Sequence, residues 1–300
     1  MNALTSTLND DFGENGHLAF RDAGEGFIVI DIDNCHCTAT IALQGAHLMR
    51  WNPKGEEPVI WMSPAATLAE GKSIRGGVPI CWPWFGAHAT EADFSAHGFA
   101  RTVAWDVINT SSLDDGTTCI SFRIAEINRD MWSDQVPVEM HMQIGARLEM
   151  ELVTKNRSEE SVTVGDALHT YFCVSDVSKV SVRGLDACEY LDKVGPTVRK
   201  TQKGNINFDQ EVDRIYFDQG QDIVIRDPIM HRDIRIEKRN SHSTIVWNPW
   251  IDKTLRMGDF GSDDGYLGMV CVESANADAD MVKLAPGYTH RLWVRYSIEK

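Results

Sequence analysis

The chain has 300 residues, and its 44 acidic residues outnumber its 29 basic ones, which gives a formal net charge of −15. Its hydrophobic content of 43% and charged content of 24% are ordinary for a soluble globular protein. The acidic balance argues against nucleic acid or an anionic membrane as a partner, because both require a basic surface. It leaves room for a small anion held by a few local cations, since exposed charges are screened beyond roughly 8 Å.

Residues 1–20 lack the basic and apolar regions of a signal peptide, and no segment approaches the roughly 20 apolar residues of a membrane span. The seven cysteines are odd in number and mostly lie in apolar segments, which predicts reduced thiols in a cytoplasmic protein. Cys35, His36 and Cys37 have no second ligand pair nearby, so a strand is a better interpretation than a metal site.

Short segments rich in β-branched and aromatic residues recur along the whole chain. They alternate between apolar and polar positions and are bounded by Gly, Asn, Asp and Pro, as β-strands are. In chain order the predicted strands are 27–33, 38–43, 58–62, 103–109, 118–125, 138–156, 161–174, 213–218, 222–227, 233–239, 243–248, 268–273 and 291–298.

Several of these segments carry charge at alternate positions, as in 233–239, which indicates one wet and one buried face and favours antiparallel sheets. Helical patterns are nearly absent, apart from a possible short turn around 252–258. Many strands without crossover helices predict an all-β fold, a large antiparallel β-sandwich. We find no linker and no repeat, so we expect residues 1–300 to form a single domain.

Residues 74–101 (IRGGVPICWPWFGAHATEADFSAHGFAR) form the least regular stretch. Its glycines and prolines exclude a regular central strand and predict a long loop on the β scaffold, where binding groups usually lie. Arg75 and Arg101 are its two arginines. Facing one pocket, they would bind a carboxylate or phosphate; pairing of each with a surface acid is the alternative.

His169 and Glu273 both lie in otherwise apolar strand segments. A lone histidine there is more often a core residue than a catalyst, but a buried carboxylate needs a partner or a tuned pKa. These two therefore form the acid/base pair that the sequence nominates. Asp213 and Asp192 are weaker candidates for hydrogen bonding a polar ligand.

Motifs for nucleotide-driven phosphoryl transfer, dinucleotide binding, serine hydrolysis and zinc proteolysis are not found. Tryptophans at 82, 84, 247 and 250 suit a sugar-binding site, although core packing explains them equally well.

At these residues the sequence resembles the hexose-6-phosphate mutarotases (glucose-6-phosphate 1-epimerases), a branch of the aldose 1-epimerase family. The resemblance covers roughly residues 25–298 and implies a galactose-mutarotase-like β-supersandwich. The matching motifs, in family order, are RGGVPICWPWFG at 75–86, HGFAR at 97–101, ALHTYF at 167–172, EVDRIYF at 211–217, WNPW at 247–250 and MVCVES at 269–274.

The resemblance implies that His169 is the general acid and Glu273 the general base of anomer interconversion, with no metal and no cofactor. On this basis we expect His169 to be largely protonated near neutrality, Glu273 to be ionised, and the rate profile to show a sharp acid limb. The expected substrate is a small sugar phosphate, most simply glucose 6-phosphate, and the expected state is a monomer.

The resemblance also implies the binding residues. Arg75 and Arg101 match arginines that hold the sugar phosphate, His97 a histidine at the anomeric end, and Asp213 an acid that binds sugar hydroxyls. Three rival functions stay open: an aldose 1-epimerase on free sugars, a non-catalytic sugar-phosphate-binding or sensor module, and a glycoside hydrolase. The last would normally need two carboxylates.

Overall fold

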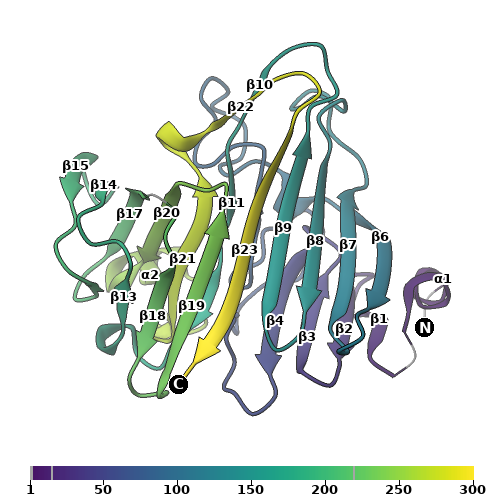
Figure 1. Cartoon of the computed structure of the whole chain (residues 1–300), viewed down its shortest axis with the longest axis horizontal. Coiled ribbons are helices and arrows are strands. Elements are labelled where there is room, and N and C mark those ends of the chain that lie inside the picture. The colour runs from purple at the N-terminus through teal and green to yellow at the C-terminus, as the bar shows by residue number, and fades with distance from the viewer. Residues whose placement is uncertain (1–2, 15, 219) are drawn as a thin grey trace.

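A computed structural model describes residues 3–14, 16–218 and 220–300. Nearly all of its regular structure is antiparallel β-sheet, which confirms the all-β prediction (Figure 1). The α-helices of the described residues are α1 (Ala3–Phe12) and α2 (Trp250–Met257). Neither is long and apolar enough to cross a membrane.

Two large sheets dominate the fold, each described here in its order of strand pairing. The nine-stranded sheet contains β16 (Ile206–Asn207), β13 (Ser181–Arg183), β18 (Ile223–Asp227), β19 (Arg232–Arg239), β23 (Thr289–Glu299), β9 (Leu148–Lys155), β8 (Val138–Ile144), β7 (Thr118–Ile124) and β6 (Trp105–Ser112). The eight-stranded sheet contains β15 (Val198–Thr201), β14 (Glu189–Asp192), β17 (Val212–Phe217), β20 (Ser243–Asn248), β21 (Met269–Asn276), β11 (Asp166–Leu168) and β5 (Ile80–Cys81), with β12 (Tyr171–Cys173) also paired to β21.

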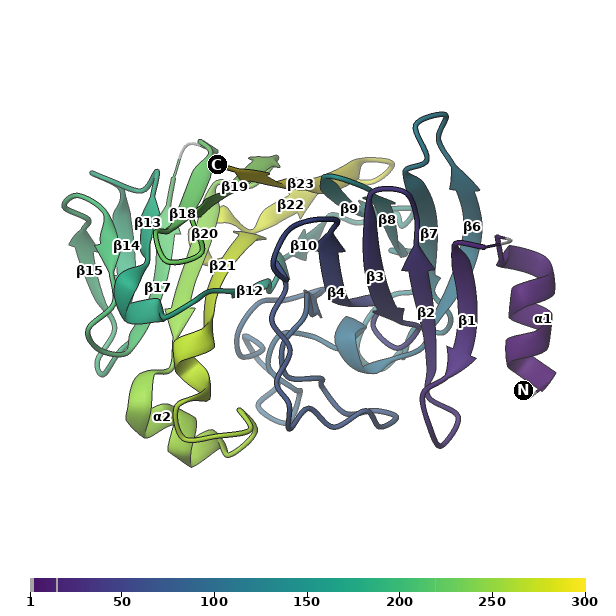
Figure 2. The ribbon, with the colours of Figure 1, turned by 90° about the horizontal axis from the view of Figure 1, so that it is seen from below.

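Two smaller sheets complete the fold. The four-stranded sheet contains β1 (Leu18–Asp22), β2 (Ile28–Asp33), β3 (Cys37–Ala42) and β4 (His47–Pro53), and the two-stranded sheet contains β10 (Val162–Val164) and β22 (Val282–Leu284). The four- and eight-stranded sheets lie side by side against the nine-stranded one (Figure 2). Helix α2 and the loops between β4 and β6 extend from the side away from the nine-stranded sheet (Figure 2).

The main hydrophobic core lies between these layers and draws on all three larger sheets, with residues such as Ile30, Phe122 and Val272. Alternate burial along β7, β8 and β19 gives each strand one core face and one solvent face, as predicted. Strands β20 and β21 are buried along their whole length, because loops and α2 cover the outer face of the eight-stranded sheet. That covered face carries a second apolar cluster, which includes Tyr171, Trp247 and Phe260.

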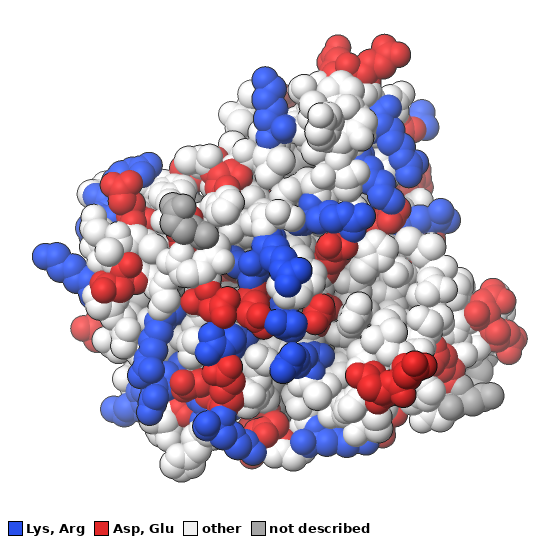
Figure 3. Space-filling view, in the orientation of Figure 1, with Lys and Arg blue, Asp and Glu red and all other residues white. Residues whose placement is uncertain are grey.

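The outer face of the nine-stranded sheet is charged, and Lys and Arg alternate with Asp and Glu across it (Figure 3). Arg235 pairs with Glu299 at 2.6 Å, and Arg291 pairs with Glu151 at 2.6 Å. This face needs no further cover, because its side chains are matched to one another and to water.

The structure corrects the strand prediction at three places. Residues 58–62 form isolated bridges instead of a strand, after Pro58 interrupts the backbone donors. The segment 138–156 is two strands joined by a turn, and 161–174 is three short strands. Helix α1 was not predicted, and strands β1, β4, β5, β13–β16 and β22 were also missed.

Candidate active site

The covered face of the eight-stranded sheet brings the predicted site residues together through its register. Residues directly opposite on neighbouring strands point to the same face. Asp213 on β17 is opposite Trp247 on β20, Trp247 is opposite Cys271 on β21, and Cys271 is opposite Tyr171 on β12. Glu273 lies two residues beyond Cys271, so it points to this face as well.

His169 reaches this face because regular strand structure is interrupted between β11 and β12, at residues 169 and 170. Its amide donates to the carbonyl of Pro79 at 2.9 Å, and the amide of Thr170 turns back to Leu168 at 2.8 Å. The imidazole stacks on Tyr171 with 4.9 Å between ring centroids. Its Nε2 lies 3.4 Å from Oε1 of Glu273, so the structure brings the two nominated acid/base residues together.

Burial moves both members of this pair towards their neutral forms. It lowers the pKa of His169 well below its ordinary value of 6.5, and the positive charge of Arg101 lowers it further. Burial also raises the pKa of Glu273 well above 4.5, with help from the charge of Asp213. The expectation of a largely protonated His169 beside an ionised Glu273 is therefore wrong, because burial disfavours the charged form of both residues.

The remaining polar atoms of the pair are free to meet a ligand. Among the described residues, Nδ1 of His169 and Oε2 of Glu273 are buried and have no hydrogen-bond partner. The His169 side chain is 13% exposed, whereas Glu273 is 1% exposed. A ligand that contacts the carboxylate would therefore also have to lie against the imidazole.

Arg75 is held firmly beside the pair. Its Nε donates to Asp259 at 2.9 Å, and its Nη1 donates to the Tyr171 hydroxyl at 2.7 Å. The guanidinium also lies 5.3 Å from the centre of the Phe260 ring. The predicted alternative, pairing with an acid, thus holds for Arg75. Its guanidinium is still connected to the site by the hydrogen bond to Tyr171.

Arg101 and His97 lie on the loop that the sequence singled out, and the ring centroid of His97 is 5.9 Å from that of His169. Arg101 is in a single 3₁₀ turn (Ala100–Thr102) and donates from Nη2 to the Ala96 carbonyl at 2.9 Å. The Gly86 amide donates to Nδ1 of His97 at 3.3 Å, which leaves Nε2 of His97 as the protonated nitrogen. Burial lowers the pKa of His97 to about 3, so this imidazole is a neutral donor.

Asp213 and Asp192 separate to opposite faces of the sheet. Asp213 shares the site face and accepts from Lys253 of α2 at 3.2 Å. Asp192 is opposite Arg214, one residue out of phase with Asp213, and accepts from Lys200 at 2.7 Å. Of the two weaker candidates, the structure therefore places only Asp213 at the site.

One group of side chains near the pair has the composition of a metal site. His169, Cys271 and Glu273 have ligand atoms within 4.8 Å of one another. Burial raises the pKa of Cys271 well above 9.0, which keeps its thiol protonated and a poor ligand. We retain the prediction that the acid/base chemistry uses no metal.

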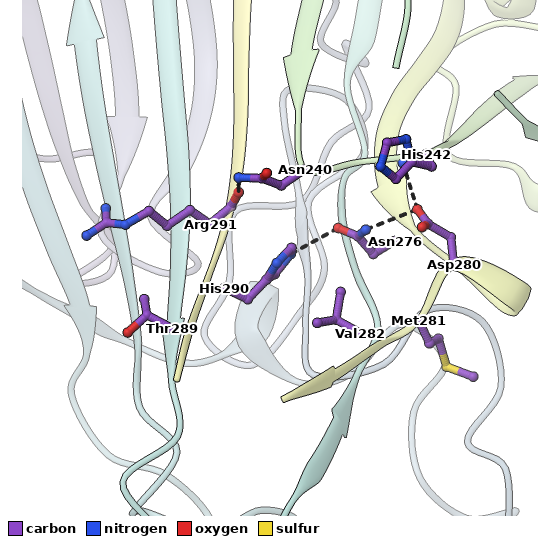
Figure 4. Close-up of a pocket in the computed structure, with 9 residues that line it drawn as sticks. All are labelled: Asn240, His242, Asn276, Asp280, Met281, Val282, Thr289, His290 and Arg291. Atoms are coloured by element: carbon purple, nitrogen blue, oxygen red, sulfur yellow. Dashed lines mark hydrogen bonds between the residues drawn. The ribbon is translucent and has the colours of Figure 1, made fainter. Parts of the chain in front are cut away.

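A separate surface cavity of about 450 Å³ lies away from this face (Figure 4). Its polar groups bind one another: His290 contacts Asn276 at 3.0 Å, and Asn276 donates to Asp280 at 3.0 Å. Asn276 lies three residues beyond Glu273 on β21 and hence points to the opposite face of the sheet. We interpret this cavity as part of the structural network between the sheets.

Several residues of the site were missed by the sequence analysis. Tyr171 could have been found, since it alternates with His169 in the same apolar run. Trp247 was noted only as a general sugar-binding signal. Asp259, Phe260 and Lys253 carry no local signal, because α2 and the loop after it reach the site only through the tertiary fold.

The sequence profile of the aldose 1-epimerase family matches residues 29–297. The chain belongs to the aldose 1-epimerase family. The predicted family is thus confirmed, and this epimerase is 36% identical over 252 residues to an Escherichia coli (strain K12) protein provisionally named glucose-6-phosphate 1-epimerase, with 83% of each chain covered. A provisionally named relative from Cenchrus ciliaris is 32% identical, covering 84% of this chain and 78% of its own.

Solved structures agree with the fold of this epimerase. The crystal structure of a provisionally named mutarotase (YeaD) from Salmonella typhimurium has a TM-score of 0.87 at 31% identity, with 95% and 94% of the two chains covered. The galactose 1-epimerase of Lactobacillus acidophilus NCFM has a TM-score of 0.68 at 11% identity, with 94% and 98% covered. The second likeness concerns the fold alone and confirms the predicted galactose-mutarotase-like sandwich.

Proposed function

We propose that this epimerase interconverts the α and β anomers of a hexose 6-phosphate, most simply glucose 6-phosphate, by acid/base ring opening and reclosure. The observation that carries the proposal is the buried His169–Glu273 contact of 3.4 Å on a sheet face lined by aromatic rings. The glucose-6-phosphate 1-epimerase names of the relatives at 31–36% identity support the substrate class.

The chemistry needs one proton on the pair, on either member. In the working form, ionised Glu273 removes the proton of the C1 hydroxyl while protonated His169 gives one to the ring oxygen. The bond between C1 and the ring oxygen breaks, which leaves an aldehyde at C1 and a hydroxyl at C5. Rotation about the C1–C2 bond and reclosure, with both proton transfers reversed, yield the other anomer.

The other site residues bind the substrate in this proposal. Asp213 accepts hydrogen bonds from sugar hydroxyls, and neutral His97 donates from Nε2 near the anomeric end. Arg75 and Arg101 supply positive charge on either side of His169 for the anionic substrate, and Trp247 offers an apolar face to the sugar ring.

The direct test is the rate of anomer exchange in glucose 6-phosphate, measured by NMR magnetisation exchange against the spontaneous rate. Glu273→Gln and His169→Asn should each lower kcat by about 10²- to 10⁴-fold, which is the usual contribution of a positioned acid or base. Asp192→Asn is the matched control, because Asp192 points to the opposite face and should leave the rate unchanged.

Two rivals predict different results. An aldose 1-epimerase for free sugars would turn over galactose as fast as glucose 6-phosphate and tolerate Arg101→Ala. A sugar-phosphate sensor would bind tightly but give no exchange above the spontaneous rate, with Glu273→Gln behaving as the parent protein. Either result would contradict the proposal.

The proposal extends to the setting of the enzyme. All seven cysteines are free thiols, which suits the reducing cytoplasm. We further propose a monomer of one domain with a small-molecule partner, a sugar phosphate, and with neither nucleic acid nor a membrane as a partner.

A further inference from the structure

Lys193 lies at the end of β14 and was not singled out by its sequence. Its amide donates to the carbonyl of Asp213 at 2.8 Å, which continues by one residue the register that pairs Asp192 with Arg214. Lys193 is thereby the cross-strand partner of Asp213, and directly opposite side chains share a face. The lysine therefore extends the row of Asp213, Trp247 and Cys271 on the site face.

The charge of Lys193 has no carboxylate partner among the described residues. The cations around it are matched: Lys200 pairs with Asp192 at 2.7 Å, and Lys253 pairs with Glu211 at 2.8 Å and with Asp213 at 3.2 Å. Lys193 is opposite Asp213 across the strand pair, but the ion pair that Asp213 makes is with Lys253.

Arg101 also has no carboxylate partner among the described residues. It makes one hydrogen bond, to the Ala96 carbonyl, while its buried Nε has no partner in that part of the chain. Both Arg101 and Lys193 act on His97, since their positive charges help to lower its pKa. Arg75 differs, because Asp259 already balances its charge.

We propose that Lys193 and Arg101 together hold the phosphate of the substrate, with Lys193 as a specificity residue for phosphorylated over free hexoses. The inference rests on the proposed function and assigns its anion subsite. Arg101 supplies a planar fork for two phosphate oxygens, and Lys193 adds a compact charge on a flexible stem. His97 connects the proposed anion subsite to the acid/base pair, because its ring centroid is 5.9 Å from that of His169.

The test compares Lys193→Ala with the parent enzyme on glucose 6-phosphate and on free glucose. We expect Lys193→Ala to lower kcat/KM for glucose 6-phosphate by roughly tenfold, which corresponds to losing one hydrogen bond to a charged group. The loss should appear mainly in KM, turnover of free glucose should be unchanged, and Lys193→Arg should restore most of the loss. Inorganic phosphate should also inhibit Lys193→Ala more weakly than the parent.

Lys200→Ala is the matched control, because Lys200 is an exposed lysine close in sequence whose charge is taken by Asp192. It should leave both substrates unaffected. Equal losses on both substrates, or no loss on glucose 6-phosphate, would overturn the assignment of Lys193 while leaving the epimerase activity intact. If the parent enzyme does not accelerate anomer exchange at all, the proposed function itself is wrong.

Discussion

At the scale of single residues, the His169–Glu273 pair holds its proton in a dry environment that disfavours charge on either partner. In the proposed mechanism the pair is active with one proton and inactive with two or none. The rate should therefore show a bell-shaped pH dependence, whose two apparent pKa values belong to the pair. The second proton would have to go to His169, whose pKa is lowered. We therefore expect kcat/KM to fall on the acid side only well below pH 6.5, the pKa of an ordinary histidine.

The alkaline limb reports loss of the last proton, and its position depends on the burial of Glu273 and on the charge of Asp213. The charge of Asp213 raises the pKa of Glu273, so Asp213→Asn should move the alkaline limb to lower pH. Asp192→Asn should leave the limb in place, since Asp192 points to the other face. A pH–rate profile of each variant on free glucose makes the measurement, and an upward movement in Asp213→Asn would refute the electrostatic account.

His47 is the basis of a prediction about the stability of the protein. It is fully buried, its Nε2 donates to the Gly76 carbonyl, and burial lowers its pKa from 6.5 to about 4. Between pH 6.5 and 4, His47 binds a proton in the unfolded chain but not in the folded one. Its contribution to the free energy of unfolding is therefore fully present above pH 6.5 and is lost as the pH falls towards 4.

The predicted loss from His47 is roughly 3 kcal/mol over that interval. Urea unfolding at pH 7 and pH 4.5 should show a smaller difference for His47→Gln than for the parent protein. An unchanged difference would show that His47 is not the group responsible.

At the scale of elements, the loop from 74 to 101 depends on a close approach of backbones. Trp82 accepts from the amides of Phe99 and Ala100 through its carbonyl, and this holds the turn that carries Arg101. Gly98 lies against that carbonyl at a φ of +69°, and an added Cβ would lie 1.9 Å from the oxygen. The turn can close only because Gly98 has no side chain.

Gly98→Ala should therefore displace Arg101 and His97 and lower kcat/KM for glucose 6-phosphate at least tenfold, with a loss of stability. Gly55→Ala is the matched control: its φ is +83°, but no atom lies within 4 Å of the added carbon. It should show the backbone strain of about 1 kcal/mol without the steric clash. Equal effects in the two variants, by activity and thermal unfolding, would argue against the close-approach explanation.

The elements also show what the sequence could and could not predict. Period-two alternation identified most long strands, because their two faces meet such different surroundings. Helix α1 was invisible, since its Thr, Ser, Asn and Asp residues are weak helix formers. It is held instead by Asn9, whose amide group bonds both the carbonyl and the amide of Phe20 on β1.

The same limit applies to the site. The apolar sequence around His169 and Glu273 indicated both residues, because an ionisable group in a buried strand needs a partner or a shifted pKa. Lys193 and Asp259 lie in ordinary polar surroundings and become site residues only through strand register and the path of α2. No local pattern could have indicated either of them.

At the scale of the whole molecule, a net charge of −15 opposes the approach of a sugar phosphate, and capture depends on a few local cations. Long-range attraction is then absent, so there is little steering for salt to screen. We expect kcat/KM for glucose 6-phosphate to change by less than about threefold between 20 and 150 mM salt. Stopped-flow or NMR rates at matched pH would test this, and a steep fall with salt would indicate a steering field instead.

Glu273 lies near the middle of β21, a strand paired on both sides and buried throughout its length. Core strands of this kind open with free energies close to that of global unfolding. The proposed catalytic carboxylate is therefore held by a part of the fold that we expect to open last, whereas Arg75, His97 and Arg101 lie on loops and turns. Changes in these loops can alter substrate binding without loosening the strand that carries the proposed base.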